Sequence, residues 1–187
     1  MTAYTEALPS APQELVLRRA EESDLPELRR LDHEIFGRFA YPPFLLRQLF
    51  DLYQRHFLVL DDGSGLLHGY VLAGTDALSR DCWILGLCVT RDRRGRGLGR
   101  DLMREILLLL RDAGTRVVRL TVEPANSAAV LLYRSLGFTC EEPDGGLRPD
   151  YFGPGQDRLV MRLDLGPAGP AGPAGPVSPA VPAGPAR

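Results

Sequence analysis

Apolar and polar residues alternate along this chain with two periodicities, one typical of strands and one typical of helices. Apolar runs and period-two segments predict strands over residues 14–20, 57–60, 66–74, 82–89, 117–123, 138–142 and 158–165. Helical spacing predicts helices over 25–36, from Pro42 or Pro43 to about Arg55, over 97–112 and over 127–136. Ser23, Asp24 and Asn126 are candidate N-caps of these helices.

The order of the elements is β-α-α-β-β-β-α-β-α-β-β. It predicts a mixed α/β (α+β) fold, in which a central sheet of about seven strands carries helices on both faces. Strands linked by a helix are expected to run parallel, so the centre of the sheet should be parallel. The strand at 82–89 is almost continuously apolar, as expected where both faces of a strand are covered.

Length and composition predict one folded domain with a flexible segment at each terminus. The 187 residues are 44% hydrophobic and 25% charged, which is enough for one core, and we expect the domain to cover residues 14–165. Residues 1–13 are small, polar and proline-containing. Residues 166–187 are almost wholly Gly, Pro, Ala, Val and Ser, so both ends are predicted to be flexible.

Charge and residue spacing argue against several classes of function. The net charge is -2 and no aromatic platform accompanies the arginines, so no nucleic-acid partner is expected. The first residues do not resemble a signal peptide and the apolar run Ile106–Leu110 is too short to cross a bilayer, so we expect a cytoplasmic protein without a membrane partner. Three scattered histidines and three cysteines without a CxxC pair predict no metal site and reduced, buried thiols.

The segment TRDRRGRGLGRDLM, from Thr90 to Met103, places five arginines and three glycines between an apolar strand and a helix. A glycine-rich loop leading into a helix N-terminus is a common phosphate site, because free amides and the helix dipole face the anion. The loop lacks the lysine of a GxxxxGK[ST] motif, and its G-x-G-x-G spacing is one residue short of the dinucleotide-binding GxGxxG. Taken alone, it is equally compatible with a pyrophosphate site and with a solvated loop.

Two motifs together resemble the GNAT family of N-acetyltransferases. RGRGLG, Arg94–Gly99, resembles the family motif R/Q-x-x-G-x-G/A, and NSAAVLLYRSLGF, Asn126–Phe138, resembles its Asn-capped helix that carries a tyrosine and ends in Leu-Gly-Phe. Segments 38–50 and 150–163 are most similar to bacterial ribosomal-protein N-terminal (alanine) acetyltransferases. The resemblance covers about residues 14–165. It implies the GNAT fold with a splayed central strand pair, and acetyl transfer with acetyl-CoA as co-substrate.

The resemblance also implies where acetyl-CoA lies. Backbone groups of the strand at 82–89 would pair with the pantetheine arm, loop amides would hold the pyrophosphate, and Asn126 would contact the cofactor. The implied cofactor-binding residues are Leu87, Cys88, Val89, Arg94, Gly95, Arg96, Gly97, Leu98, Gly99, Arg100 and Asn126. Arg91, Arg93 or Arg100 would reach the 3′-phosphate, and the sequence does not choose among them.

The implied reaction is attack of a free amine on the thioester and departure of the CoA thiolate. Tyr133 is implied as the proton donor to the thiolate, since a phenol with a pKa of about 10 is protonated at neutral pH. Its spacing alone would indicate only an aromatic residue on the core face of a helix. An α-amine, with a pKa of about 8, loses its proton more readily than a lysine amine at about 10.4, which favours a protein or peptide N-terminus as acceptor.

One position departs from the relatives, which carry a glutamate base five residues before the asparagine. Here that position is Thr121, and Glu123, on the same strand face, is the candidate catalytic base, although it fits a solvated charge at a strand end equally well. A peptide acceptor would need an open groove beside residues 38–43 and 141–155. A small-molecule amine such as a drug or polyamine, and an acyl-CoA-binding module without catalysis, remain alternatives. The protein is expected to be a monomer or homodimer.

Overall fold

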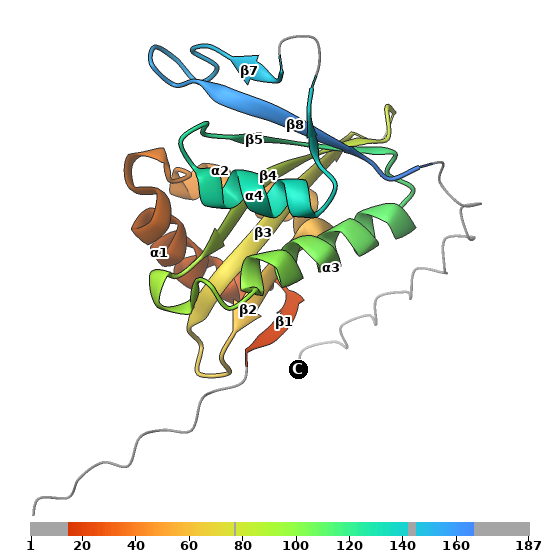
Figure 1. The fold of residues 1–187 in the computed structure, drawn as a ribbon. Helices are drawn as coiled ribbons and strands as arrows, with labels where there is room; N and C mark the ends of the chain where they lie inside the picture. Colours follow the sequence, from red (N-terminus) through yellow and green to blue (C-terminus); the bar gives the residue numbers. More distant parts are fainter. Residues whose placement is uncertain (1–14, 77, 142–144, 167–187) are drawn as a thin grey trace, which may run out of the picture.

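The computed structural model of the protein describes residues 15–76, 78–141 and 145–166. These residues form one eight-stranded sheet with helices on both faces (Figure 1). The strand order is β1-β2-β3-β4-β5-β8-β6, with β7 also paired to β8. The strands are β1 Val16–Arg19, β2 Phe57–Asp61, β3 Leu67–Asp76, β4 Asp81–Val89, β5 Val117–Val122, β6 Thr139–Cys140, β7 Leu147–Arg148 and β8 Arg158–Asp164.

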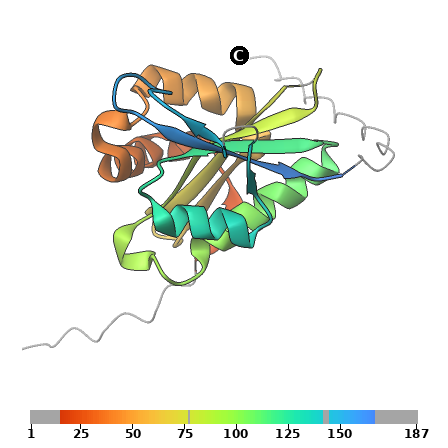
Figure 2. The same cartoon turned by 45° about the horizontal axis from the view of Figure 1, so that its top comes forward.

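Four α-helices cover the sheet, as expected from the sequence. They are α1 Leu25–Phe36, α2 Pro43–Tyr53, α3 Leu98–Asp112 and α4 Ser127–Ser135. Figure 2 shows α1 and α2 on one face and α3 and α4 on the other. Each face has its own core: Leu28, Leu31 and Phe50 pack with Tyr70 under α1 and α2, whereas Met103 and Ile106 lie in the core under α3 and α4.

The two central strands, β4 and β5, run parallel and are linked by α3, whereas the other strand pairs in the described residues are antiparallel. β4 and β5 pair only between Asp81–Ile84 and Val117–Leu120. Leu85 is an extra residue in β4, since Gly86 lies opposite Leu72 and Ile84 opposite Ala73. Such a bulge bends its strand. The parallel centre and the splayed strand pair are both confirmed, and the bulge lies where the pairing ends.

Three features of the fold differ from the sequence prediction. The sheet has eight strands rather than about seven, because Leu147–Arg148 pairs with β8 inside a segment expected to be a loop. Asp24 occupies the N-cap position of α1, but its carboxylate accepts hydrogen bonds from Arg18 and from the backbone of Glu21 instead of capping the helix. The strand expected at 138–142 is limited to Thr139–Cys140.

The predicted flexible ends, residues 1–13 and nearly all of 166–187, lie outside the described residues, as does position 142. In the part of the chain that the structure describes, no helix is long and apolar enough to cross a membrane.

Candidate active site

A cleft of about 940 Å³ opens where β4 and β5 diverge. Its walls come from the end of β4, the loop before α3, the end of β5, the first turns of α4 and the segment that joins α1 to α2. Every site residue predicted from the sequence lines this cleft except Arg96 and Arg91, the latter a candidate for the 3′-phosphate. The fold therefore brings together two motifs that lie about 30 residues apart in the sequence.

The backbone of β4 alternates between the sheet and the cleft. The amide of Thr90 donates to the carbonyl of His68 at 2.8 Å, which makes this a hydrogen-bonded pair with β3. Because hydrogen-bonded and non-hydrogen-bonded pairs alternate along an antiparallel ladder, Cys88 also directs its backbone groups to β3, and Leu87 and Val89 direct theirs to the cleft. Cys88 thus lines the cleft without offering its backbone to it, in contrast to the sequence expectation.

The loop before α3 turns on two glycines. Gly95 and Gly97 have φ angles of +76° and +84°, a left-handed conformation that other residues adopt at a cost. The space around both is open, since a Cβ built at Gly95 meets nothing within 4 Å and one at Gly97 meets only Asp101 at 4.0 Å. The glycines are therefore required by the backbone turn itself and not by a close neighbour.

Two arginines, one in the loop and one in the first turn of α3, tie this region to its neighbours. The Nε of Arg94 donates to the carbonyl of Val89 at 3.0 Å and so ties the loop to the end of β4. A terminal nitrogen of Arg100 donates to the hydroxyl of Ser135 at 3.1 Å, which joins α3 to α4. Arg93 and Arg100 line the cleft, whereas Arg91 is not among the lining residues.

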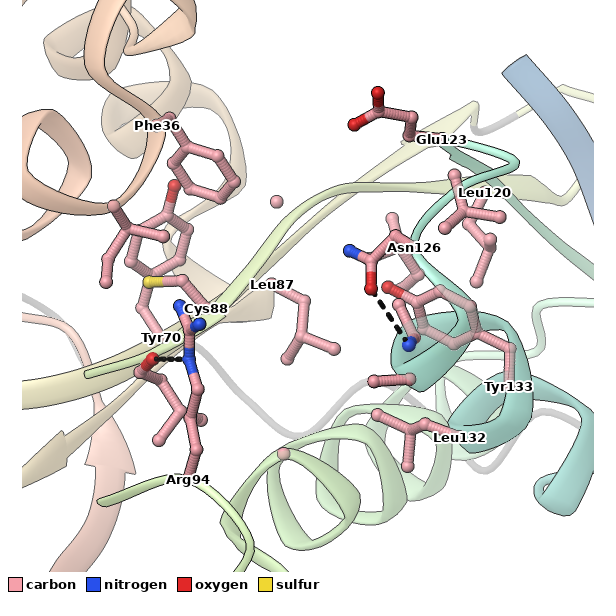
Figure 3. Close-up of a pocket in the computed structure, with 18 of the residues that line it drawn as sticks. Phe36, Tyr70, Leu87, Cys88, Arg94, Leu120, Glu123, Asn126, Leu132 and Tyr133 are labelled. Carbon is pink, nitrogen blue, oxygen red and sulfur yellow. Dashed lines mark hydrogen bonds between the residues drawn. The ribbon is translucent and has the colours of Figure 1, made fainter. Parts of the chain in front are cut away.

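The opposite wall is α4, which carries Asn126 and Tyr133. The side-chain oxygen of Asn126 accepts the amide of Ala129 at 3.1 Å, so the predicted cap is confirmed. Figure 3 shows Asn126 and Tyr133 side by side, facing Leu87 across the cleft. Tyr133 is 7% exposed and packs on Phe138, and burial raises its pKa to about 12. Its hydroxyl therefore stays protonated throughout the neutral range.

Glu123 stands at the rim of the same wall. It is exposed, follows β5 directly, and its backbone carbonyl accepts the amide of Asn126 at 2.9 Å. Both Thr121 and Glu123 line the cleft, so the position that carries glutamate in relatives does face the cleft here. Val122 pairs with Leu159 in β8, which places Arg158 across from Glu123. Arg158 also lines the cleft, and sequence patterns did not indicate it.

The far end of the cleft is formed by the segment between α1 and α2. Phe36, Phe39 and Tyr41 line it. Phe39 is 53% exposed, so this end is an open aromatic wall beside the segment where a peptide groove was expected. Beneath the wall lies a buried polar pair, Asp32 and Tyr70, that the sequence did not reveal.

Two of the three cysteines are buried. Cys82 and Cys88 are buried free thiols, and burial raises the pKa of each to about 12, so neither forms a thiolate near neutral pH. Cys140 is only half-buried, unlike the expectation. Among residues 15–76, 78–141 and 145–166, no group of three or more His, Cys, Asp or Glu side chains could hold a metal ion.

Comparison with known proteins identifies the family. The sequence model of the acetyltransferase (GNAT) family matches residues 20–138. The N-alpha-acetyltransferase RimI of Mycobacterium tuberculosis is 34% identical over 150 residues, an alignment that covers 77% of this chain and 89% of that protein. The chain spans less than half the length of the mycothiol acetyltransferases that it also matches. This protein belongs to the GNAT family and is an N-acetyltransferase of that family.

Solved structures share the fold. A ribosomal-protein-alanine N-acetyltransferase from Brucella melitensis superimposes with a TM-score of 0.67 at 26% identity, over 81% of this chain and 100% of that one. A phosphinothricin acetyltransferase from Sinorhizobium meliloti, solved in complex with acetyl-CoA, gives a TM-score of 0.69 at 21% identity, over 88% of this chain and 96% of that one. The mixed sheet with its splayed strand pair is thus the fold of the family.

Proposed function

We propose that this protein transfers the acetyl group of acetyl-CoA to the α-amine at the N-terminus of a protein or peptide. The observation that carries the proposal is the cleft between the diverging strands. It joins a glycine-turned loop at the start of α3 to an open aromatic wall at the α1–α2 segment. Loop, protonated phenol and wall line one continuous space, as a reaction between a phosphate-bearing donor and a separate acceptor requires.

In this proposal the pantetheine arm lies along β4, where the backbone groups of Leu87 and Val89 continue the ladder. The amides from Gly95 to Gly99 hold the pyrophosphate at the positive end of the α3 dipole. Arg93 and Arg100 line the cleft and are the cations that reach the 3′-phosphate. Asn126 contacts the cofactor and caps α4 at the same time.

The chemistry follows from the two sides of the cleft. A free amine attacks the thioester carbonyl, the C–N bond forms, and the C–S bond breaks. Tyr133, which is protonated at any neutral pH because its pKa is about 12, gives its proton to the departing thiolate. Glu123 accepts the proton of the amine through a water molecule, because its carboxylate stands at the rim of the cleft, opposite Arg158. Solvent then returns a proton to the resulting phenolate, while Glu123 releases the proton of the amine to solvent.

The aromatic wall supports a peptide acceptor. Phe36, Phe39 and Tyr41 offer apolar surface for the first side chain of a peptide, and Phe39 leaves the cleft open at that end for the chain to continue. The similarity to an N-alpha-acetyltransferase and to a ribosomal-protein-alanine acetyltransferase supports the same class of acceptor.

A screen with acetyl-CoA tests the proposal. The full chain is incubated with peptides that differ in their first residue, with the same peptides blocked at the N-terminus, and with lysine-bearing peptides and small amines. We expect mass spectrometry to find acetylation on free N-termini and none on blocked ones. Acetylation confined to small amines would overturn the peptide assignment, and acetyl-CoA binding without transfer would overturn catalysis.

A further inference from the structure

Asp32 in α1 is buried, with an exposed fraction of 1%, although most aspartates lie at the surface. One carboxylate oxygen accepts the hydroxyl of Tyr70 at 2.5 Å, and the other accepts the backbone amide of Tyr41 at 2.6 Å. Burial raises the pKa of Asp32, and these two hydrogen bonds oppose the rise. A buried carboxylate that accepts two hydrogen bonds holds both donors in defined positions, because a buried donor without a partner costs free energy.

Both of these tyrosines also contact the bulged stretch of β4. The hydroxyl of Tyr41 donates to the carbonyl of Leu85, the extra residue of the bulge, at 2.7 Å. The ring of Tyr70 lies so close to Gly86 that a Cβ built there would be 2.9 Å from its Cε2 atom. Asp32 therefore connects the α1–α2 segment to β4 at the point where β4 leaves β5.

The hydrogen bonds of this cluster do not involve the cofactor loop. Asp32, Tyr41 and Tyr70 line the cleft. Figure 3 shows Tyr70 on the side of Phe36, across the cleft from Asn126 and Tyr133. Tyr41 is thus clamped at both ends, by its amide to α1 and by its hydroxyl to β4. The clamp fixes one wall of the acceptor space relative to the strand along which the thioester would lie.

We propose that Asp32 is a positioning residue for the acceptor amine, acting through Tyr41 and Tyr70 to hold the α1–α2 wall against Leu85 and Gly86. The inference rests on the proposed function and deepens it, since it names the residues that place the acceptor. Loosening the clamp is expected to weaken use of the acceptor more than acetyl-CoA binding, because none of its hydrogen bonds involves the loop before α3 or α4.

The first test is Tyr41→Phe, which removes one hydroxyl and its bond to Leu85. The matched control is Tyr53→Phe at the end of α2, whose ring packs at Gly74 near the Leu85 side chain but does not line the cleft. We expect the acceptor KM of Tyr41→Phe to rise about three- to tenfold, the factor of one net hydrogen bond. Its kcat and its acetyl-CoA Kd from calorimetry should stay near those of the control. An unchanged acceptor KM, or an equal loss of acetyl-CoA affinity, would overturn the inference.

The second test compares Asp32→Asn with Asp32→Ala. Asparagine can still accept the amide of Tyr41 and donate to the oxygen of Tyr70, whereas alanine leaves both groups without a partner. We expect Asp32→Asn to keep an acceptor KM closer to the wild type than Asp32→Ala does. If Asp32→Ala does not fold, Asp32→Asn is compared with Tyr41→Phe, and an acceptor KM for Asp32→Asn that exceeds that of Tyr41→Phe contradicts the clamp.

The acetylation activity of the wild type distinguishes failure of this inference from failure of the proposed function. If the wild type acetylates an amine other than a peptide N-terminus, the acceptor class is wrong, and the same variants are compared on that amine. If the wild type acetylates none, the proposed function fails and the role of Asp32 falls with it. If the wild type is active and both tests leave the acceptor KM unchanged, only the role of Asp32 is overturned.

Discussion

Asn126 and Tyr133 lie about two helical turns apart on α4, and both side chains line the same wall of the cleft. The spacing of seven residues returns the helix to nearly the same face, so the cap that starts α4 also aims Tyr133 at the cleft. Burial against Phe138 then fixes the ring and keeps its hydroxyl protonated.

This arrangement predicts that Tyr133→Phe lowers kcat and leaves acetyl-CoA affinity nearly intact. The variant keeps the ring in its packed position and removes only the proton donor. A positioned general acid contributes about 10²- to 10⁴-fold, and kcat should fall within that range. Steady-state kinetics and calorimetry measure the two quantities separately. Equal loss of kcat and of affinity would mean that Tyr133 is structural.

The pH profile of the wild type should rise with the free amine and then stay level. An α-amine titrates at about 7.7–8.0, so kcat/KM should reach half its plateau there. Tyr133 donates only while protonated, and its raised pKa keeps it protonated on the alkaline side, so no fall is expected until the pH approaches about 12. A midpoint at about 10.4 would instead point to a lysine-like acceptor.

Gly97→Ala should weaken acetyl-CoA binding, whereas an equally strained substitution outside the cleft should not. A side chain at φ +84° costs about 1–2 kcal/mol or displaces the turn that presents the loop amides. Gly63→Ala is the matched control, because Gly63 has φ +78° and equally open space in the turn between β2 and β3. We expect at least about a tenfold loss of acetyl-CoA affinity for Gly97→Ala only, from one charged hydrogen bond.

Asn126 is expected to have two separable roles. Asn126→Ala should lower the free energy of unfolding by about 1 kcal/mol, the worth of a helix cap, whereas Asn126→Ser should restore it because serine also caps helices. Acetyl-CoA affinity should fall in both variants if the amide contacts the cofactor. Full affinity in Asn126→Ser would reduce Asn126 to a cap.

Glu123→Gln tests the base directly. At pH 7 the variant should lose about 10²-fold in kcat/KM, and the deficit should shrink at higher pH, where the amine is free without help. Glu105→Gln on α3, outside the cleft lining, is the control. A variant that matches the control at every pH would make Glu123 a solvated charge.

The features predicted well from the sequence are those set by local backbone chemistry. The cap at Asn126 and the turn at Gly97 depend on residues a few positions away, and the apolar run at 82–89 has few alternatives to a buried strand. The missed features join distant positions. Tyr70 meets Asp32 across 38 positions, and Tyr41 meets Leu85 across 44, so no local pattern signals them.

The extra strand β7 was missed for a related reason. Two residues give no period to detect, and the pairing depends on Gly146, where a Cβ would collide with the carbonyl of Val160. The direction of the Cys88 backbone was also beyond the sequence, because it is set by the register with β3.

The most direct measurement of the central claim is release of CoA thiol from acetyl-CoA by the full chain, with and without a peptide that has a free N-terminus. The account predicts thiol release that requires the free N-terminus, together with one acetyl group on its α-amine in the mass spectrum. Tight acetyl-CoA binding with no peptide-dependent thiol release would contradict it.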